Sequence, residues 1–389
     1  MPQENAYREA HAVTRGPHCH FFGYYDKTPW DETGRYLLGI QTTFMDRPPR
    51  SGETAVLGRI DTQSGNLWIP FAQTRAWNWQ QGTMLHWLGH TPDRALIHND
   101  LRNGRLVSTA RDLFTGEERE YPLPVYNVSR DGAQAVSLNF ARVARTRPGY
   151  GYLGADDPTE GDLCPDDDGV YWMDLNTGEH RLILSLAQIA AIQPEESMRG
   201  AEHWFNHLLF NPSGTRFIFL HRWKNKERNA WRTRLFTAKP DGTEIRPLNL
   251  HGMTSHFDWR GDAHVLAWAH EPSIGNRFFL YEDLSDAKEV VGEGVLTADG
   301  HCSYSPDGRW ILNDAYPGQD GRRALMLFDP AENRRIDIGR FLAPKALQGE
   351  IRCDLHPRWS RDGRKVCIDS AHEGARQMYV LDVGDLTRK

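Results

Sequence analysis

Apolar residues occur along the chain in short runs separated by polar turns, and this arrangement recurs seven times. Each recurrence opens with a turn rich in Gly, Asp and Ser, continues with an apolar run, and closes with a second run before an Asp-centred hairpin. Short runs rich in β-branched and aromatic residues between such turns are typical of strands. The first runs of the seven segments are Arg35–Ile40, Ala95–His98, Ala135–Leu138, Phe217–Leu220, His264–Trp268, Trp310–Leu312 and Lys365–Ile368.

The segments follow one another at intervals of about 40 to 60 residues, the length of a four-stranded propeller blade. Neighbouring blades cover both faces of each sheet, so their strands need apolar residues on both faces. The pattern predicts an all-β protein, in which residues 1–389 form a single seven-bladed β-propeller domain and the N-terminal segment completes the last blade. The third interval is the longest, because it contains the polar stretch Tyr150–Gly169 and the stretch Leu182–Ser197, where we expect a short helix. Long insertions usually carry function.

Composition indicates which kinds of partner and which cellular location fit the chain. The net charge of −6 gives no basic footprint, which argues against nucleic acid. No apolar run approaches the length of about 20 residues that spans a membrane. The N-terminal residues lack an apolar signal core, so a cytoplasmic location is expected. The five cysteines are odd in number and irregularly spaced, unlike a disulfide framework. The oligomeric state is left open.

Four histidines occupy equivalent positions in the last four segments. Each lies three residues before the aromatic residue that precedes a turn, on the stretch expected to form the innermost strand beside the channel. Imidazoles that converge on one axis suggest a metal or an anion at that axis, although histidines bonded to water or backbone could also line a channel. A thiolate near imidazoles favours zinc, with manganese as the alternative divalent metal. The predicted ligands are His256, His301, Cys353 and His356, with His207 adjacent.

A second group suits proton transfer. His98, Tyr126 and Arg142 lie in the second and third segments, on the side of the ring that lacks the inner histidines. Elimination from a uronic acid requires a cation at the carboxylate, a base for the C5 proton and an acid for the leaving O4. We predict that Tyr126 exchanges the protons, Arg142 neutralises the carboxylate and His98 assists. The alternative is a buried tyrosine bonded to a packed arginine.

Substrate-binding residues are expected at the rim. Arg147 and Tyr150 lie on a Gly-punctuated loop that could stack sugar rings and bind carboxylates, or be an ordinary surface loop. Asn78 and Gln81 provide amides for hydroxyl recognition between aromatic residues that could equally be core. His20 lies in an entry segment that we interpret as structure and rim lining.

Four motifs together resemble the metal-binding repeats of propeller-fold polysaccharide lyases, which include oligogalacturonate lyase, with manganese, and the seven-bladed ulvan lyases, with zinc. These motifs are Asn206-His207, Ser255–Trp259, Gly300–Gly308 and Cys353–Pro357. The resemblance implies cleavage of a uronic-acid-containing oligo- or polysaccharide by β-elimination, giving a 4,5-unsaturated uronate.

The resemblance also bears on individual residues. In oligogalacturonate lyase a Gln and a His three residues later bind the metal, and Cys353 and His356 have that spacing. Arg358 stands where that family has a second His, a departure that implies a Cys-containing zinc site. In the ulvan lyases two His are followed by a Tyr and an Arg, an order that His98, Tyr126 and Arg142 share. Asn78 stands in place of the first His, so ulvan itself is not implied.

Two other functions fit the sequence. A similar propeller could hydrolyse a rhamnose–glucuronate linkage, or serve as a binding scaffold without catalysis. A hydrolase needs two carboxylates at a suitable separation, and the spacing of Asp100, Asp258 and Asp354 does not mark a pair. This favours the lyase. The glycan, the bond, endo or exo action and the identity and role of the metal are left open.

Overall fold

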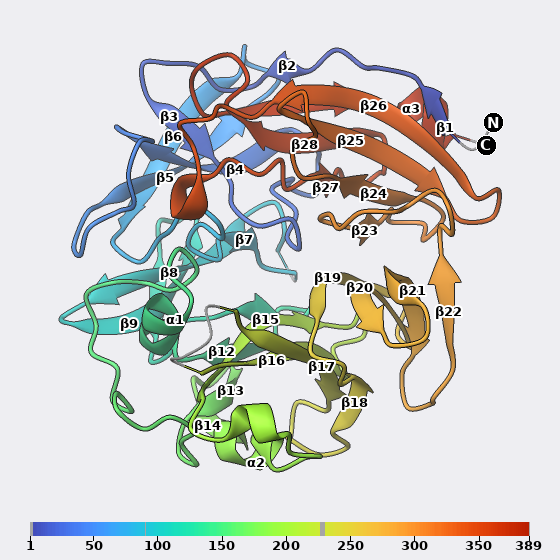
Figure 1. The fold of residues 1–389 in the computed structure, drawn as a ribbon. Coiled ribbons are helices and arrows are strands. Elements are labelled where there is room, and N and C mark those ends of the chain that lie inside the picture. The colour runs from blue at the N-terminus through green and yellow to red at the C-terminus, as the bar shows by residue number, and fades with distance from the viewer. Residues whose placement is uncertain (1–2, 90, 226–229, 389) are drawn as a thin grey trace.

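The computed structural model describes residues 3–89, 91–225 and 230–388. These residues form seven sheets arranged in a ring, so the chain is a seven-bladed β-propeller, as the repeats predict (Figure 1). Consecutive strands of each blade pair antiparallel, and the first strand of each is innermost, beside the central axis. In the described residues, no helix is long and apolar enough to cross a membrane.

The blades follow the order of the chain. Blade 1 contains β3 (Cys19–Phe21), β4 (Tyr36–Thr42), β5 (Ala55–Asp61) and β6 (Leu67–Thr74). Blade 2 contains β7 (His86–Trp87), β8 (Ala95–Arg102), β9 (Arg105–Asp112) and β10 (Glu118–Tyr121). Blade 3 contains β11 (Asn127–Val128), β12 (Gln134–Leu138), β13 (Gly169–Asp174) and β14 (His180–Ser185). Blades 4 and 5 contain β15 (Glu202–Phe210), β16 (Phe217–Lys224), β17 (Arg232–Ala238) and β18 (Arg246–Asn249); and β19 (Thr254–Arg260), β20 (His264–Glu271), β21 (Gly275–Glu282) and β22 (Lys288–Val291). Blades 6 and 7 contain β23 (Ser303–Tyr304), β24 (Ile311–Asp314), β25 (Arg322–Asp329) and β26 (Arg334–Leu342); and β27 (Arg358–Trp359), β28 (Lys365–Ser370) and β29 (Gln377–Asp382).

The N-terminal segment closes the ring. Its strand β2 (His11–Ala12) pairs antiparallel with β29 and becomes the outer strand of blade 7, as predicted. The preceding strand β1 (Gln3–Asn5) pairs parallel with β26 and gives blade 6 a fifth strand, which the repeats do not predict. Both ends of the chain thus contribute to the closing sheets.

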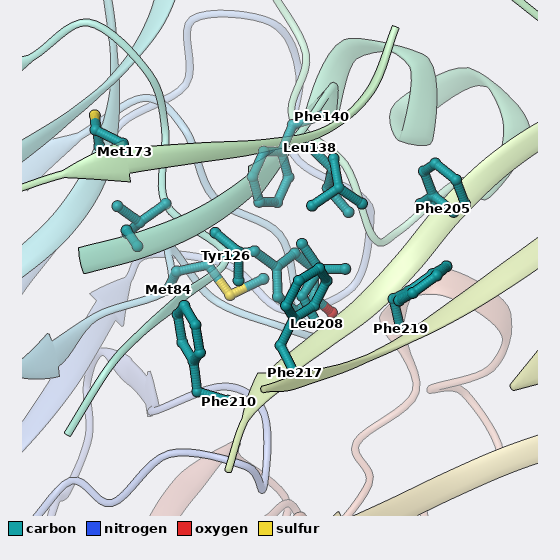
Figure 2. Close-up of a cluster of buried hydrophobic side chains, with 14 of the residues drawn as sticks. Met84, Tyr126, Leu138, Phe140, Met173, Phe205, Leu208, Phe210, Phe217 and Phe219 are labelled. Carbon is teal, nitrogen blue, oxygen red and sulfur yellow. The ribbon is translucent and has the colours of Figure 1, made fainter. Parts of the chain in front are cut away.

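The core lies between the blades because the middle strands are apolar on both faces. In β16 every residue from Phe217 to Trp223 is buried. Figure 2 shows one such interface, in which Tyr126 and Phe140 face aromatic residues of blade 4. Full burial of one such side chain contributes about 1.5 to 3 kcal/mol, so these clusters fix each blade against the next.

Short helices lie outside the blades. Helix α1 (Phe140–Thr146) begins the insertion of blade 3, and its N-cap Asn139 accepts a hydrogen bond from the backbone of Arg142. Helix α2 (Leu186–Ala190) begins with a capping box between Ser185 and Gln188 and lies inside the stretch predicted to be helical. The remaining helical turns are η1 (Glu196–Met198), η2 (Gly349–Ile351) and α3 (Gly384–Thr387).

Candidate functional site

Irregular backbone brings the histidines of blades 4 to 7 to the axis. The pairing of β15 with β16 shifts register between Asn206 and Leu209, and that of β19 with β20 shifts between Thr254 and Phe257. His207 and His356 have positive φ angles of 54° and 41°. Bulges re-aim side chains, and non-glycine residues with positive φ are uncommon and gather at functional sites.

The imidazoles gather around one tyrosine that the sequence does not single out. The ring of Tyr24 stacks on His207 at a centroid distance of 4.9 Å and meets the ring of His356 edge-on at 5.0 Å. The ring of His301 lies 4.1 Å from that of His256 and 4.4 Å from that of His356. The convergence expected from the repeats is therefore present in the structure.

Two of these histidines and a carboxylate have the geometry of metal ligands. His301, Asp354 and His356 are buried, and each offers one ligand atom within 4.8 Å of the others. Asp314 accepts from Nδ1 of His301 at 2.9 and 3.0 Å, which leaves Nε2 as the free nitrogen. The Nε2 atoms of His301 and His356 have no hydrogen-bond partner among the described residues. A carboxylate behind an imidazole is the usual support of a metal-bound histidine.

The protonation states suit a cation. Burial lowers the pKa of His301, although Asp314 opposes the shift, and burial together with neighbouring cationic groups lowers that of His356 well below its ordinary value. Both imidazoles are therefore neutral at neutral pH, as metal ligation requires. Two nitrogens and one carboxylate oxygen suit a divalent ion such as zinc or manganese.

The structure does not bring Cys353 into this group. Its side chain packs in a small apolar cluster with Leu347 and Ala371, and burial raises the pKa of the thiol to about 11. The neighbouring residue, Asp354, enters the group instead, where Arg352 and Arg323 each approach its carboxylate to 2.6 Å. The sequence signal for Asp354 is its position in the Cys353–Pro357 motif. The role of Asp354 is missed because the neighbouring thiol of Cys353 is predicted to be a ligand instead.

His256 is hydrogen-bonded to a different carboxylate, that of Asp299. Its Nδ1 lies 2.9 Å from Oδ1 of Asp299, so this nitrogen donates and Nε2 is left as the basic atom. The residue retains 7% of its exposure. An imidazole that a carboxylate orients in this way is suited to general-base catalysis. His256 therefore has two possible roles, metal ligand and base, beside the group of His301.

The three residues predicted to be catalytic, His98, Tyr126 and Arg142, do not form one group. Tyr126 is buried, with its hydroxyl 2.5 Å from Nε2 of Gln81 and 3.0 Å from Nδ1 of His207. Burial raises the pKa of Tyr126 well above its ordinary value, with a further contribution from Asp26. His98 is buried on β8, where its Nδ1 donates to the backbone oxygen of Asn99 at 3.0 Å.

Arg142 fastens the blade 3 insertion to blade 4. Its Nε donates to the backbone oxygen of His203 at 2.8 Å. Its Nη2 donates to the backbone oxygens of Asp162 and Leu163 at 2.9 and 3.1 Å, and its Nη1 to the side chain of Thr159 at 3.2 Å. With its donors directed at the protein, this guanidinium is poorly placed to neutralise a substrate carboxylate.

We expect Arg142→Met to destabilise the fold by about 3 kcal/mol or more, because several buried carbonyl oxygens lose their donor. Denaturant unfolding measures this change. Arg145→Ala is the matched control on the same helix; its partly exposed ion pairs with Asp157 and Glu202 should contribute about 1 kcal/mol at most. If Arg142→Met instead kept its stability and lost activity, the result would favour the predicted role of Arg142 in neutralising the substrate carboxylate.

A different arginine is buried with two nitrogens that no described residue satisfies. Arg222 lies on β16 and is 5% exposed, and its Nε and Nη1 have no hydrogen-bond partner among the described residues. Burial, and then repulsion from Arg147, lowers its pKa to about 10. The charge of Arg222 contributes to lowering the pKa of His207, which connects this arginine to the histidine group. The sequence signal is a cation within a largely apolar strand, which alone does not distinguish a ligand site from a packed ion pair.

The predicted substrate-binding residues separate into two sets. The guanidinium of Arg147 lies between the rings of Tyr150 and Trp231, at 4.5 and 4.1 Å. Tyr150 is edge-on to His207 at 5.8 Å, so this loop joins the histidine group, as does Gln81 through its bond to Tyr126.

Asn78 and His20 have other surroundings. Asn78 accepts from the backbone nitrogens of Gln80 and Gln81 and donates to the backbone oxygen of Gly151, so it holds two loops together. His20 bonds Gln377 and Gln41 at 3.0 Å each and lines a separate cavity beside Trp68. Asn78 thus has a positioning role near the site, and His20 lies outside it.

The chain matches no protein-family model and no curated protein sequence. It is similar in structure to oligogalacturonate lyase from Vibrio parahaemolyticus, with 14% identity, 99% of this chain and 97% of that chain covered, and a TM-score of 0.68. An oligogalacturonate lyase in complex with manganese has 16% identity, covers 97% and 94% of the two chains, and gives a TM-score of 0.67. The tricorn protease, with 12% identity and a TM-score of 0.54, is matched over 95% of this chain but 34% of its own. At these identities the similarity establishes the propeller fold.

Proposed function

We propose that the protein is a lyase that cleaves a uronic-acid-containing oligo- or polysaccharide by β-elimination with the help of a divalent metal. The observation that carries the proposal is the guanidinium of Arg222, which is buried near the histidine group and whose Nε and Nη1 have no hydrogen-bond partner in the part of the chain that the structure describes. A buried cation without a counter-ion is costly unless a ligand supplies one. A carboxylate is the anion that each uronic acid residue carries, and the whole-chain similarity to oligogalacturonate lyases agrees with such a ligand.

The residues present can divide the work of an elimination. Arg222 binds the substrate carboxylate and so acidifies the C5 proton. Nε2 of His256 accepts that proton, while Asp299 holds the ring and stabilises the imidazolium that forms. Gln81 and Tyr126 hold His207 beside the site. These roles replace those predicted for Arg142 and Tyr126, whose polar atoms face the protein.

The metal would be held by His301, Asp354 and His356. When bound, it supplies positive charge that favours the developing negative charge on the substrate carboxylate. A set of two nitrogens and one oxygen accommodates both zinc and manganese. The preference for zinc rested on Cys353, so we propose a divalent metal without choosing between them.

Hydrolysis has less support. The carboxylates beside the histidines are bonded to imidazole or guanidinium groups, namely Asp299 to His256, Asp314 to His301 and Asp354 to Arg352. A hydrolase needs one protonated and one free carboxyl group on either side of the scissile bond. The surroundings of these three carboxylates favour supporting roles. A scaffold without catalysis gives no role to the imidazole of His256, which Asp299 orients as a base.

Arg222→Met tests the proposal. We expect kcat/KM for elimination to fall about 30- to 5,000-fold, the equivalent of losing about 2 to 5 kcal/mol of a buried charge pair. The free energy of unfolding should stay equal or rise, because an apolar side chain replaces a buried charge that has no ion pair among the described residues. Steady-state kinetics and denaturant unfolding give both quantities.

The matched control is Arg216→Met in the same blade. Arg216 is buried and paired with Asp283, so its loss should destabilise the protein by about 3 to 5 kcal/mol. Full elimination activity in Arg222→Met would count against the proposed function of this site.

A further inference from the structure

We propose that Tyr150 is the proton donor to the leaving oxygen, and that Arg352 positions it; this inference rests on the proposed function. In the step, the C5–H bond breaks and its proton passes to His256. The C4=C5 double bond forms and the C4–O4 bond breaks. O4 takes the hydroxyl proton of Tyr150, and the phenolate that remains faces Arg352. Proton exchange with solvent then restores the neutral His256 and Tyr150.

The loop that carries Tyr150 is fixed on both sides. A Cβ atom at Gly149, whose φ is +88°, would meet the side chain of Glu350 at 3.2 Å. One at Gly151 would lie 2.3 Å from the backbone oxygen of Phe140 in α1. The two glycines therefore let the loop fit between α1 and residues 350–352. Tyr150 is 4% exposed as a result, and its position depends on the backbone rather than on a mobile rim.

One guanidinium links the phenol to the metal-ligand group. Nη2 of Arg352 donates to the hydroxyl oxygen of Tyr150 at 2.5 Å, and Nε of the same residue donates to Asp354 at 2.6 Å. Because a lone pair of the phenol oxygen is engaged by Arg352, its proton is directed away from that residue. A positively charged hydrogen-bond donor at this oxygen also stabilises the phenolate that is left after proton transfer.

The electrostatic surroundings agree with this role. Burial would raise the pKa of Tyr150, but Arg352 and Arg147 outweigh it, and the pKa lies below the ordinary value. Burial raises the pKa values of Tyr24, Tyr25 and Tyr126 well above the ordinary value. Among these four tyrosines, the pKa is lowered at Tyr150 alone.

The test compares two leaving groups. An oligouronide loses a sugar alkoxide that needs a proton, whereas a uronate glycoside with fluorine at C4 loses fluoride, which needs none. We expect Tyr150→Phe to lower kcat on the oligouronide by about 100-fold or more. On the fluorinated probe the loss should be about fivefold or less, since no proton donor is needed. KM, metal content and thermal unfolding should change little.

Tyr152→Phe is the matched control. It removes the same atom from the same loop, but its hydroxyl accepts from Asn99 in the core, so both rates should stay near those of the wild type. Near-normal activity of Tyr150→Phe on the oligouronide would overturn the assignment, and so would equal losses on both probes, which indicate a structural role. If the wild type eliminated neither probe, the proposed function itself would fail and the inference with it.

Discussion

Replacing His356 by Ala should remove the bound metal and lower elimination by about three orders of magnitude, which corresponds to roughly 4 kcal/mol of charge stabilisation. The reason is that His301 and Asp354 would remain as the only members of the buried ligand group. Thermal stability should also fall, because an ion present at 100 times its dissociation constant adds about 2.7 kcal/mol to the folded state. Elemental analysis, kinetics and thermal unfolding measure the three effects.

Cys353→Ala is the control that separates the two candidate ligand sets. The thiol packs among apolar side chains, so this variant should keep its full metal content and most of its activity. A Cys353→Ala protein without metal would contradict the ligand set of His301, Asp354 and His356 and favour the set expected from the sequence. A His356→Ala protein that keeps its metal would contradict both sets, because His356 belongs to each.

His256→Gln should lower kcat by about 10²- to 10⁴-fold, the usual range for loss of a general base. The amide cannot accept the C5 proton, but it keeps a polar group beside Asp299. Metal content should be unchanged, which elemental analysis of the same sample can check. Loss of metal in this variant would make His256 a ligand, and a near-normal rate would require another base.

The architecture could be predicted because each blade repeats a local pattern. The apolar runs and turns predict seven sheets without any long-range information, and the common position of four histidines predicts that they meet. The fifth strand of blade 6 could not be predicted, because Gln3–Asn5 pairs with residues more than three hundred positions away. Helix α1 was also missed, since it begins in a strand-rich stretch and depends on the cap at Asn139.

The chemistry of the site depends on the directions in which its side chains point, and the sequence does not specify these directions. Cys353 and Asp354 are neighbours in a segment without regular structure, so strand alternation does not tell which one faces the histidines. Arg142 and Arg222 are both buried arginines, and they differ in whether carbonyl oxygens are within reach. Side-chain type therefore predicts candidates for the site, and three-dimensional packing selects among them.

The most direct measurement is product analysis after incubation with uronate oligosaccharides in water enriched in heavy oxygen, with the divalent metal supplied. Elimination predicts one 4,5-unsaturated uronate end for each bond cleaved, seen as conjugated ultraviolet absorbance and a vinyl proton resonance, with no heavy oxygen from cleavage in the products. Arg222→Met should make this product far more slowly. Saturated ends that carry heavy oxygen would mean hydrolysis, and intact oligosaccharides across the uronate panel would mean a binding scaffold; either result would contradict the lyase.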